Sequence, residues 1–301
     1  MNLSVQIGSM TLKNPVTLAS GTSGYGEELS RFMDLSSIGA IFTKGLSLKP
    51  REGNKGNRII ETPSGVLNSI GLENVGLESF LKDKLPFLIQ SGATVIPNVA
   101  GHSIDENMEL CKTLSRTRGV HALELNVSCP NVKEGGIAFG TEMGIFTELV
   151  SKVRKVTECP LIVKLSPNVT DVTEFAVRAQ EIGADAISAV NTFLGMKIDI
   201  KKRKPYFLNK VAGLSGPAIR PMALRIVYQL YEQLSIPVIG LGGILTLEDM
   251  LEFIMAGASA VSIGTATMVY PEKAAELLEK LVDYMNTASI TDISDLIGAA
   301  H

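Results

Sequence analysis

Short runs of β-branched and aliphatic residues alternate with longer segments of helical period along almost the whole chain, and this alternation restricts the fold more than any other feature. The runs are apolar on both faces, as in parallel strands that helices cover on either side. The expected strands are Val16–Ala19, Ala40–Thr43, Thr94–Pro97, Ala122–Asn126, Leu161–Leu165, Ala186–Val190, Val238–Leu241 and Ala260–Ile263. The segments between and after them predict helices at Glu27–Leu35, Leu77–Gln90, Ile104–Ser115, Glu142–Thr157, Val172–Ile182, Pro217–Leu234, Leu247–Met255 and Pro271–Met285.

Several predicted helix ends carry recognisable caps. Gly92, Gly183 and Gly257 each follow a helical segment and precede an alanine, which is typical of a left-handed C-cap that leads into the next strand. Asp171 and Thr246 stand where N-caps are expected, and acidic residues follow both of them in the first turn. The caps therefore support the same division into strand–helix units as the apolar pattern.

About eight strand–helix units in 301 residues match a (β/α)8 barrel. A hairpin is expected before them, with strands Val5–Ile7 and Met10–Leu12. The alternative is a doubly wound sheet, which usually has fewer units and often carries GxGxxG after its first strand. The segment that follows the first strand here, Ser20–Gly26, is glycine-rich but lacks that spacing. We therefore expect a single barrel domain over residues 1–301, since no linker or low-complexity stretch divides the chain.

Composition and charge exclude several classes of protein. The net charge of −3 gives no general electrostatic footprint for nucleic acid, and the basic run Lys201–Lys204 is expected to be solvated. No apolar run approaches the roughly 18 residues of a membrane helix. The N-terminus, MNLSVQIGSM, lacks a basic segment followed by an apolar one, so a cytoplasmic location is expected. The three cysteines and three histidines show no metal-binding spacing, so neither a metal nor a cluster is expected in this chain.

Three predicted connections are much longer than the others, and each follows a strand. They are Gly45–Asn74 after the second strand, Val127–Thr141 after the fourth and Asn191–Gly216 after the sixth. In a barrel such connections all emerge at the C-terminal face, where active sites are built. The sequence thus predicts a functional site at that face.

Glycine-rich segments follow the last two predicted strands. Gly240–Ile244 follows the seventh strand, and Gly264–Ala266 follows the eighth. Barrels often bind a phosphate between these two loops, and glycine lets the backbone approach it closely. Either segment alone would indicate only a tight turn. Together they favour a phosphate site, either for a phosphorylated substrate or for a phosphate-bearing cofactor such as FMN.

Polar side chains gather at the ends of the other predicted strands. A lysine within a strand is costly to bury without a partner, and the only carboxylate at a neighbouring strand end for Lys164 is Glu124. Several amides around one barrel mouth suit a flat heterocycle with alternating N–H and C=O groups. The strand-end residues are Thr43, Lys44, Asn98, Asn126, Lys164, Asn191 and Thr192.

One cysteine lies on a predicted functional loop. Cys129 follows the fourth strand in the segment NVSCPN, where a thiol can act as a base or nucleophile. Cys111 is expected to pack within a helix, and Cys159, before Pro160, is expected to be structural. No histidine is placed to activate Cys129, which argues against a mechanism like that of cysteine proteases.

A set of motifs spread over the chain resembles one enzyme family. In order they are TKG at 43–45, NSIGLEN at 68–74, NVSCPN at 126–131, KLSPN at 164–168, NT at 191–192, GLSGPAIRP at 213–221, GLGGI at 240–244 and GTA at 264–266. This set resembles the class 1 dihydroorotate dehydrogenases, and the likeness runs from the N-terminal hairpin to the SITDISDLIG tail. It implies an FMN-containing (β/α)8 barrel that oxidises dihydroorotate to orotate in pyrimidine synthesis.

The resemblance also points to a subclass. Class 2 members carry a membrane-associating N-terminal extension and a serine base, whereas this chain shows no such extension and has Cys129. SCPNVKEGGIAFGTE and NTFLGMKIDIKKRKP are similar to the NAD-linked subclass, 1B. That subclass works with a second subunit carrying FAD and a [2Fe-2S] cluster, which implies a homodimer within a heterotetramer. Phe193 and Val75 depart from the family pattern and are expected to adjust substrate fit.

Three alternatives stay open at this point. The chain is also compatible with the fumarate-linked class 1 subclass. It is compatible with another FMN-dependent enzyme that acts on a different pyrimidine, and with a barrel that binds a phosphate-bearing ligand without redox chemistry.

The resemblance implies a role for each site residue. Cys129 would take a proton from C5 of dihydroorotate while a hydride leaves C6 for flavin N5, and Gly135-Gly136 would let its loop open and close. Lys164 would stabilise the anionic reduced ring at its N1/O2 edge, and Lys44 would bridge the flavin and the substrate carboxylate. The residues expected to contact the pyrimidine are Lys44, Asn68, Ser69, Ile70, Gly71, Leu72, Asn126, Asn131, Asn191 and Thr192. Those expected to hold FMN are Ser20, Lys44, Gly45, Asn98, Asn126, Lys164, Val190, Gly216, Gly242, Gly243, Gly264 and Thr265.

Overall fold

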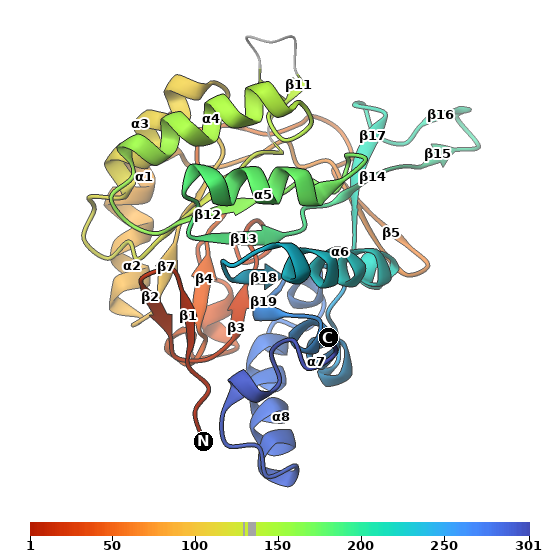
Figure 1. Ribbon diagram of the computed structural model, residues 1–301. Coiled ribbons are helices and arrows are strands. Elements are labelled where there is room, and N and C mark those ends of the chain that lie inside the picture. Colours follow the sequence, from red (N-terminus) through yellow and green to blue (C-terminus); the bar gives the residue numbers. More distant parts are fainter. Residues whose placement is uncertain (129, 132–136) are drawn as a thin grey trace.

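A parallel sheet closes on itself to form the centre of the molecule (Figure 1). The structure is a computed structural model, and it describes the backbone of residues 1–128, 130–131 and 137–301 and the side chains of 1–128 and 139–301. The hydrogen-bonded strand order is β7-β4-β3-β19-β18-β13-β12-β9-β8. Only Pro97 separates β7 from β8, so the two ends of this order are one interrupted strand and the sheet is an eight-membered barrel. Its strands are β3 Val16–Leu18, β4 Ala40–Phe42, β7 Val95–Ile96 with β8 Asn98–Val99, β9 Leu123–Asn126, β12 Leu161–Lys164, β13 Ala186–Ala189, β18 Val238–Gly240 and β19 Ala258–Ile263.

Helices surround this barrel and bury the outer faces of its strands (Figure 1). The predicted barrel is therefore confirmed, and the doubly wound alternative is excluded because all eight strands pair in a closed ring. The long helices are α3 Ile104–Leu114, α4 Met143–Val156, α5 Val172–Ile182, α6 Arg220–Gln233, α7 Leu247–Met255 and α8 Lys273–Thr287. The helix that precedes β7 is continuous but contains a wider turn in its middle. Its parts are α1 Gly76–Ser79, a π-helical turn Phe80–Lys84 and α2 Leu85–Gln90.

The predicted caps are present. Gly92, Gly183 and Gly257 all have positive φ, at 70°, 100° and 107°. Thr246 accepts a hydrogen bond from the backbone of Asp249, whose carboxylate accepts one from the backbone of Thr246 in return, so α7 begins with a full capping box. These caps fix where each helix ends and so where the following strand enters the barrel.

The helix predicted over Glu27–Leu35 is wrong. The segment forms two separate 3-10 turns, Leu29–Arg31 and Leu35–Ser37. Asp34 lies between them in an extended conformation, and its side chain accepts the backbone N–H of Ser36. Aspartate thus caps a new turn instead of continuing the first, which is the usual way in which it competes with a helix interior.

Two of the long connections pair with each other in a second, antiparallel sheet. Strands β5 Ile59–Thr62 and β6 Gly65–Asn68 come from the connection after β4, and β14 Phe193–Met196 and β17 Val211–Ser215 come from the connection after β13. Their order is β14-β17-β6-β5, and Figure 1 shows this sheet standing beside the barrel, away from α8. The sequence predicted only long loops here. This sheet forms a wall over one side of the C-terminal face.

Smaller elements complete the fold. The N-terminal hairpin has the predicted strands, β1 Val5–Ile7 and β2 Met10–Leu12. The other pairs are β10 Pro130–Asn131 with β11 Ile137–Ala138 and β15 Ile198–Asp199 with β16 Lys204–Pro205, and 3-10 turns lie at Pro217–Ile219, Thr265–Met268 and Ile293–Asp295. The basic run Lys201–Lys204 is exposed around the β15–β16 turn. Within the described ranges, no helix is both long enough and apolar enough to cross a membrane, and no group of three candidate ligands is placed to hold a metal.

Candidate active site

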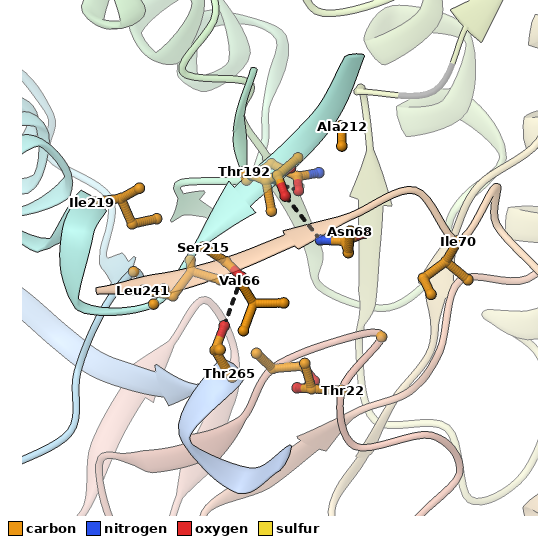
Figure 2. Close-up of a pocket in the computed structure, with 18 of the residues that line it drawn as sticks. Thr22, Val66, Asn68, Ile70, Thr192, Ala212, Ser215, Ile219, Leu241 and Thr265 are labelled. Atoms are coloured by element: carbon orange, nitrogen blue, oxygen red, sulfur yellow. Dashed lines mark hydrogen bonds between the residues drawn. The ribbon is translucent and has the colours of Figure 1, made fainter. Parts of the chain in front are cut away.

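A cavity of about 1210 Å³ opens at the C-terminal ends of the barrel strands. Its floor is the barrel mouth, and its wall is the antiparallel sheet. Figure 2 shows Val66 and Asn68 of β6, Ser215 at the end of β17 and Thr265 after β19 around the same space. The volume exceeds that of most single-ligand pockets, which measure roughly 300–1,000 Å³, so it is large enough for a cofactor together with a small substrate.

The structure brings the predicted site residues together in this cavity. Cys129 and Gly135-Gly136 lie outside the described residues, and so does the side chain of Asn131. Thr43, which the sequence grouped with the strand-end residues, is buried and does not line the cavity. The other residues expected to contact the pyrimidine or FMN all line it: Ser20, Lys44, Gly45, Asn68, Ser69, Ile70, Gly71, Leu72, Asn98, Asn126, Lys164, Val190, Asn191, Thr192, Gly216, Gly242, Gly243, Gly264 and Thr265. Ser128, which precedes Cys129, also lines it.

Lys164 is the most deeply placed cation of the cavity. Its ammonium donates a hydrogen bond to Ser20 Oγ at 2.9 Å and lies 3.7 Å from Glu124 Oε2. The two charged side chains are 5% and 2% exposed. Glu124, the one carboxylate that the sequence offered at a neighbouring strand end, is therefore the partner of Lys164, and Lys164 also lines the cavity.

Amide side chains form a connected row beside this lysine. Asn126 Nδ2 donates to Asn98 Oδ1 at 3.5 Å, and Asn191 Nδ2 donates to Asn126 Oδ1 at 3.3 Å. On the opposite wall, Asn68 Nδ2 donates to the carbonyl of Gly213 at 3.3 Å (Figure 2). The contacts at 3.3–3.5 Å are long for hydrogen bonds, so these amides retain donor and acceptor capacity for a ligand.

Lys44 provides a second cation, nearer to solvent. Its Nζ lies 4.0 Å from Glu73 Oε2, and the same oxygen accepts a hydrogen bond of 2.8 Å from Arg58 Nη1. The lysine side chain is 26% exposed. Because Arg58 already neutralises much of the Glu73 charge, the Lys44 ammonium remains available to an anionic group in the cavity.

The glycine-rich end of the cavity is shaped by backbone that tolerates no side chain. Gly216, Gly242 and Gly243 have φ values of 92°, 132° and 81°. A Cβ on Gly243 would lie 2.8 Å from both Arg220 Cβ and the Gly216 carbonyl oxygen. Thr265, which follows β19, donates through Oγ1 to Ser215 Oγ at 2.8 Å, and this bond ties the end of β17 to the last strand (Figure 2).

Ser262 adds an observation that points to a ligand at this end. It lies on β19, is 3% exposed and lines the cavity. Its Oγ has no hydrogen-bond partner among the described residues. A buried hydroxyl without a partner is costly, so a polar group brought by a ligand would satisfy it.

Several lining residues were not assigned from the sequence. Asn168 donates through Nδ2 to the carbonyl of Thr192 at 3.0 Å and accepts the N–H of Leu194 at 2.9 Å, so it holds the connection after β13. It belongs to the quoted segment KLSPN, and that motif was the signal available for it. Ser215 likewise belongs to the quoted segment GLSGPAIRP, whereas Ser262 lies in none of the quoted motifs. Phe193 and Val75, expected to adjust substrate fit, are not among the residues that line the cavity.

The groups described above match one class of chemistry. Glycine loops at the ends of β18 and β19 and the unpartnered Ser262 hydroxyl suit a phosphate-bearing cofactor. The amide row suits a planar heterocycle, and the two lysines suit an anionic substrate and an electron-accepting ring.

Comparison with known proteins gives the family. A family model described as dihydroorotate dehydrogenase matches residues 2–285. A catalytic subunit of dihydroorotate dehydrogenase B (NAD(+)) from Trichlorobacter lovleyi is 52% identical over 99% of this chain and 98% of that protein. Proteins of the same description from Desulforamulus reducens and Geobacter sulfurreducens are each 50% identical, and the alignments cover 100% and 99% of this chain and 99% and 98% of those proteins. The chain belongs to the dihydroorotate dehydrogenase family.

Proposed function

We propose that this chain is the catalytic subunit of an NAD-linked dihydroorotate dehydrogenase, in which residues 1–301 form one FMN-binding barrel. The observation that carries the proposal is the convergence on one cavity of the amide row, the two lysines and the glycine loops at the ends of β18 and β19. The family gives the reaction, and its relatives named above are NAD-linked catalytic subunits.

The residues present fit FMN. The phosphate would lie against the backbone of Gly216, Gly242, Gly243 and Gly264 with the Thr265 hydroxyl, and the Ser262 hydroxyl would gain a partner there. Ser20, Gly45, Asn98 and Val190 would line the ring. When bound, FMN supplies the acceptor for the hydride that leaves C6 of dihydroorotate.

The protein residues supply binding, orientation and proton transfer. The Lys44 ammonium binds the substrate carboxylate, and the amides of Asn68, Asn126 and Asn191 pair with the N–H and C=O groups of the pyrimidine. Cys129, outside the described residues, accepts the proton that leaves C5. The Lys164 ammonium places positive charge at the end of β12, where it favours the reduced over the oxidised ring.

The cofactor assignment can be tested on the purified chain. Denaturation should release one FMN per chain and no FAD, because the cavity shows glycine loops for one phosphate group and the chain has no dinucleotide fingerprint. Chromatography of the released flavin decides between the two. Release of FAD, or of no flavin, contradicts the proposal and favours a barrel without redox chemistry.

Transfer of electrons to NAD+ should require a second subunit. We propose that this partner carries FAD and a [2Fe-2S] cluster and binds a homodimer of this chain. The expected result is that the purified chain forms little NADH from dihydroorotate, and that co-expression of the partner restores NADH formation. The assay follows NADH absorbance, with an artificial acceptor as the positive control for the chain alone. Full NAD+ activity without a partner, or good turnover with fumarate, contradicts the subclass.

Substitution of a glycine at the glycine-rich end of the cavity tests where the cofactor phosphate binds. Gly243→Ala should weaken FMN binding by tenfold or more, because the new Cβ would meet Arg220 and the Gly216 carbonyl at 2.8 Å. Gly24→Ala is the matched control, since Gly24 also has positive φ, at 54°, but its Cβ would meet only the end of Glu28 at 3.4 Å. Titration of each apoprotein with FMN, followed by quenching of flavin fluorescence, measures the affinity. Equal losses in both variants would place the phosphate elsewhere.

A further inference from the structure

We infer that Glu124 is a positioning residue that holds the Lys164 ammonium and the Asn98 amide in place and sets the charge that the barrel presents to the cofactor. The inference rests on the proposed function, because it takes FMN as the occupant of the cavity. Glu124 is buried and is not among the residues that line the cavity, so it acts only through its neighbours.

Three strands besides its own converge on the Glu124 carboxylate. Oε1 accepts a hydrogen bond from Ser188 Oγ of β13 at 2.8 Å. Oε2 accepts one from Asn98 Nδ2 of β8 at 2.5 Å and lies 3.7 Å from Lys164 Nζ of β12. Glu124 itself lies on β9, between β8 and β12 in the sheet. The carboxylate therefore joins four consecutive barrel strands just beneath the cavity floor.

These contacts explain how Glu124, which does not line the cavity, can influence the residues that do. Asn98 and Lys164 both line the cavity, and both are held from below by the same carboxylate oxygen. Asn126 Nδ2 lies 3.5 Å from Asn98 Oδ1, so Asn98 also stands at the start of the amide row. A single buried acid thus orients the ammonium at one edge of the cavity and the first amide of the row beside it.

The charge of this acid matters as much as its geometry. A buried ammonium next to a carboxylate forms a pair of no net charge, and Coulomb interactions are strong where water is excluded. Removal of the negative charge leaves the ammonium of Lys164 uncompensated beneath the cofactor. An uncompensated positive charge favours the electron-rich reduced cofactor over the oxidised one.

The test is the reduction equilibrium of the bound flavin in variants of the holoenzyme. Glu124→Gln keeps the shape of the side chain and one acceptor oxygen but removes its charge. It should shift the equilibrium toward the reduced flavin by at least tenfold, about 30 mV for a two-electron couple. Ser188→Ala removes a hydrogen bond from the same carboxylate without a change of charge, and Glu124→Asp keeps the charge on a shorter side chain. Both should shift the equilibrium by less than threefold, as measured against reference dyes.

Two results would overturn the inference. One is a shift of less than threefold in Glu124→Gln, and the other is an equal shift in Ser188→Ala. If Glu124→Gln fails to retain flavin, thermal unfolding of Lys164→Gln and of the double variant Lys164→Gln/Glu124→Gln decides. The double variant should unfold at the higher temperature, because it leaves no unpaired buried carboxylate, and the reverse order contradicts the pairing. This comparison needs no cofactor, so a colourless wild-type protein would refute the proposed function while the pairing of Glu124 with Lys164 remained testable.

Discussion

Cys129→Ser should slow reduction of the bound flavin by dihydroorotate by about 10²–10⁴-fold while FMN stays bound. A serine hydroxyl is a much weaker base at neutral pH than a thiol, whose ordinary pKa is about 8.5. The neighbouring residues support the position, because Asn126 at the end of β9 and Ser128 both line the cavity. Anaerobic stopped-flow spectroscopy of flavin absorbance measures the rate.

Cys159→Ser is the matched control for this experiment. Cys159 precedes β12 and is half-buried, and burial raises the pKa of its thiol to about 11. It does not line the cavity, so its substitution should leave the reduction rate within twofold of the wild type. An unchanged rate in Cys129→Ser at neutral pH would exclude that thiol as the base.

Lys164→Gln should lower the rate of flavin reduction by about 10²–10³-fold, the usual cost of removing one group that stabilises developing charge. It should also destabilise the fold by about 3–5 kcal/mol, because Glu124 is left buried without its cation. Stopped-flow measures the first effect, and thermal or denaturant unfolding measures the second.

Lys84→Gln provides the comparison for a lysine in an ion pair away from the cavity. Lys84 Nζ lies 2.6 Å from Glu27 Oε2 with a quarter of its side chain exposed. Its loss should cost no more than about 1 kcal/mol and leave the reduction rate unchanged. Equal effects of the two substitutions on the rate would remove Lys164 from the reaction.

The barrel could be predicted because its signals are local. Strands buried on both faces are mostly apolar, and the left-handed glycines after three of the helices mark where the next strand begins. The helix predicted over Glu27–Leu35 does not form, although the apolar spacing of the segment fits a helix, because Asp34 makes a local hydrogen bond that starts a new turn. That competition depends on which partner the side chain finds, and spacing alone does not reveal it.

The antiparallel sheet illustrates what the sequence does not show. Asn68 of β6 donates a hydrogen bond to the carbonyl of Gly213 of β17, which is 145 residues away. Neither connection contains a local sequence pattern that predicts this pairing. One half of the sheet did carry a local signal. The runs Ile59–Thr62 and Gly65–Asn68 are separated by only two residues, as in a hairpin.

The candidate site was accessible from sequence because a barrel gathers all strand ends at one face. Lys44, Asn98 and Lys164 could therefore be grouped without knowledge of their contacts. Ser262 could not, because its role depends on whether its hydroxyl finds a partner in the folded protein. The hydrogen bonds from Asn98 and Ser188 to Glu124 likewise depend on the register of adjacent strands, which the apolar runs leave undefined.

The absorption spectrum of the purified chain under anaerobic conditions shows whether this protein is a flavin enzyme that oxidises dihydroorotate. We expect a flavin spectrum whose visible band bleaches when dihydroorotate is added and returns when an artificial acceptor is supplied. Orotate, the product, should perturb the oxidised spectrum without bleaching it. A flavin that dihydroorotate does not reduce, while another pyrimidine does, would contradict the assigned substrate, and a colourless protein that takes up no FMN would contradict the proposed flavin chemistry.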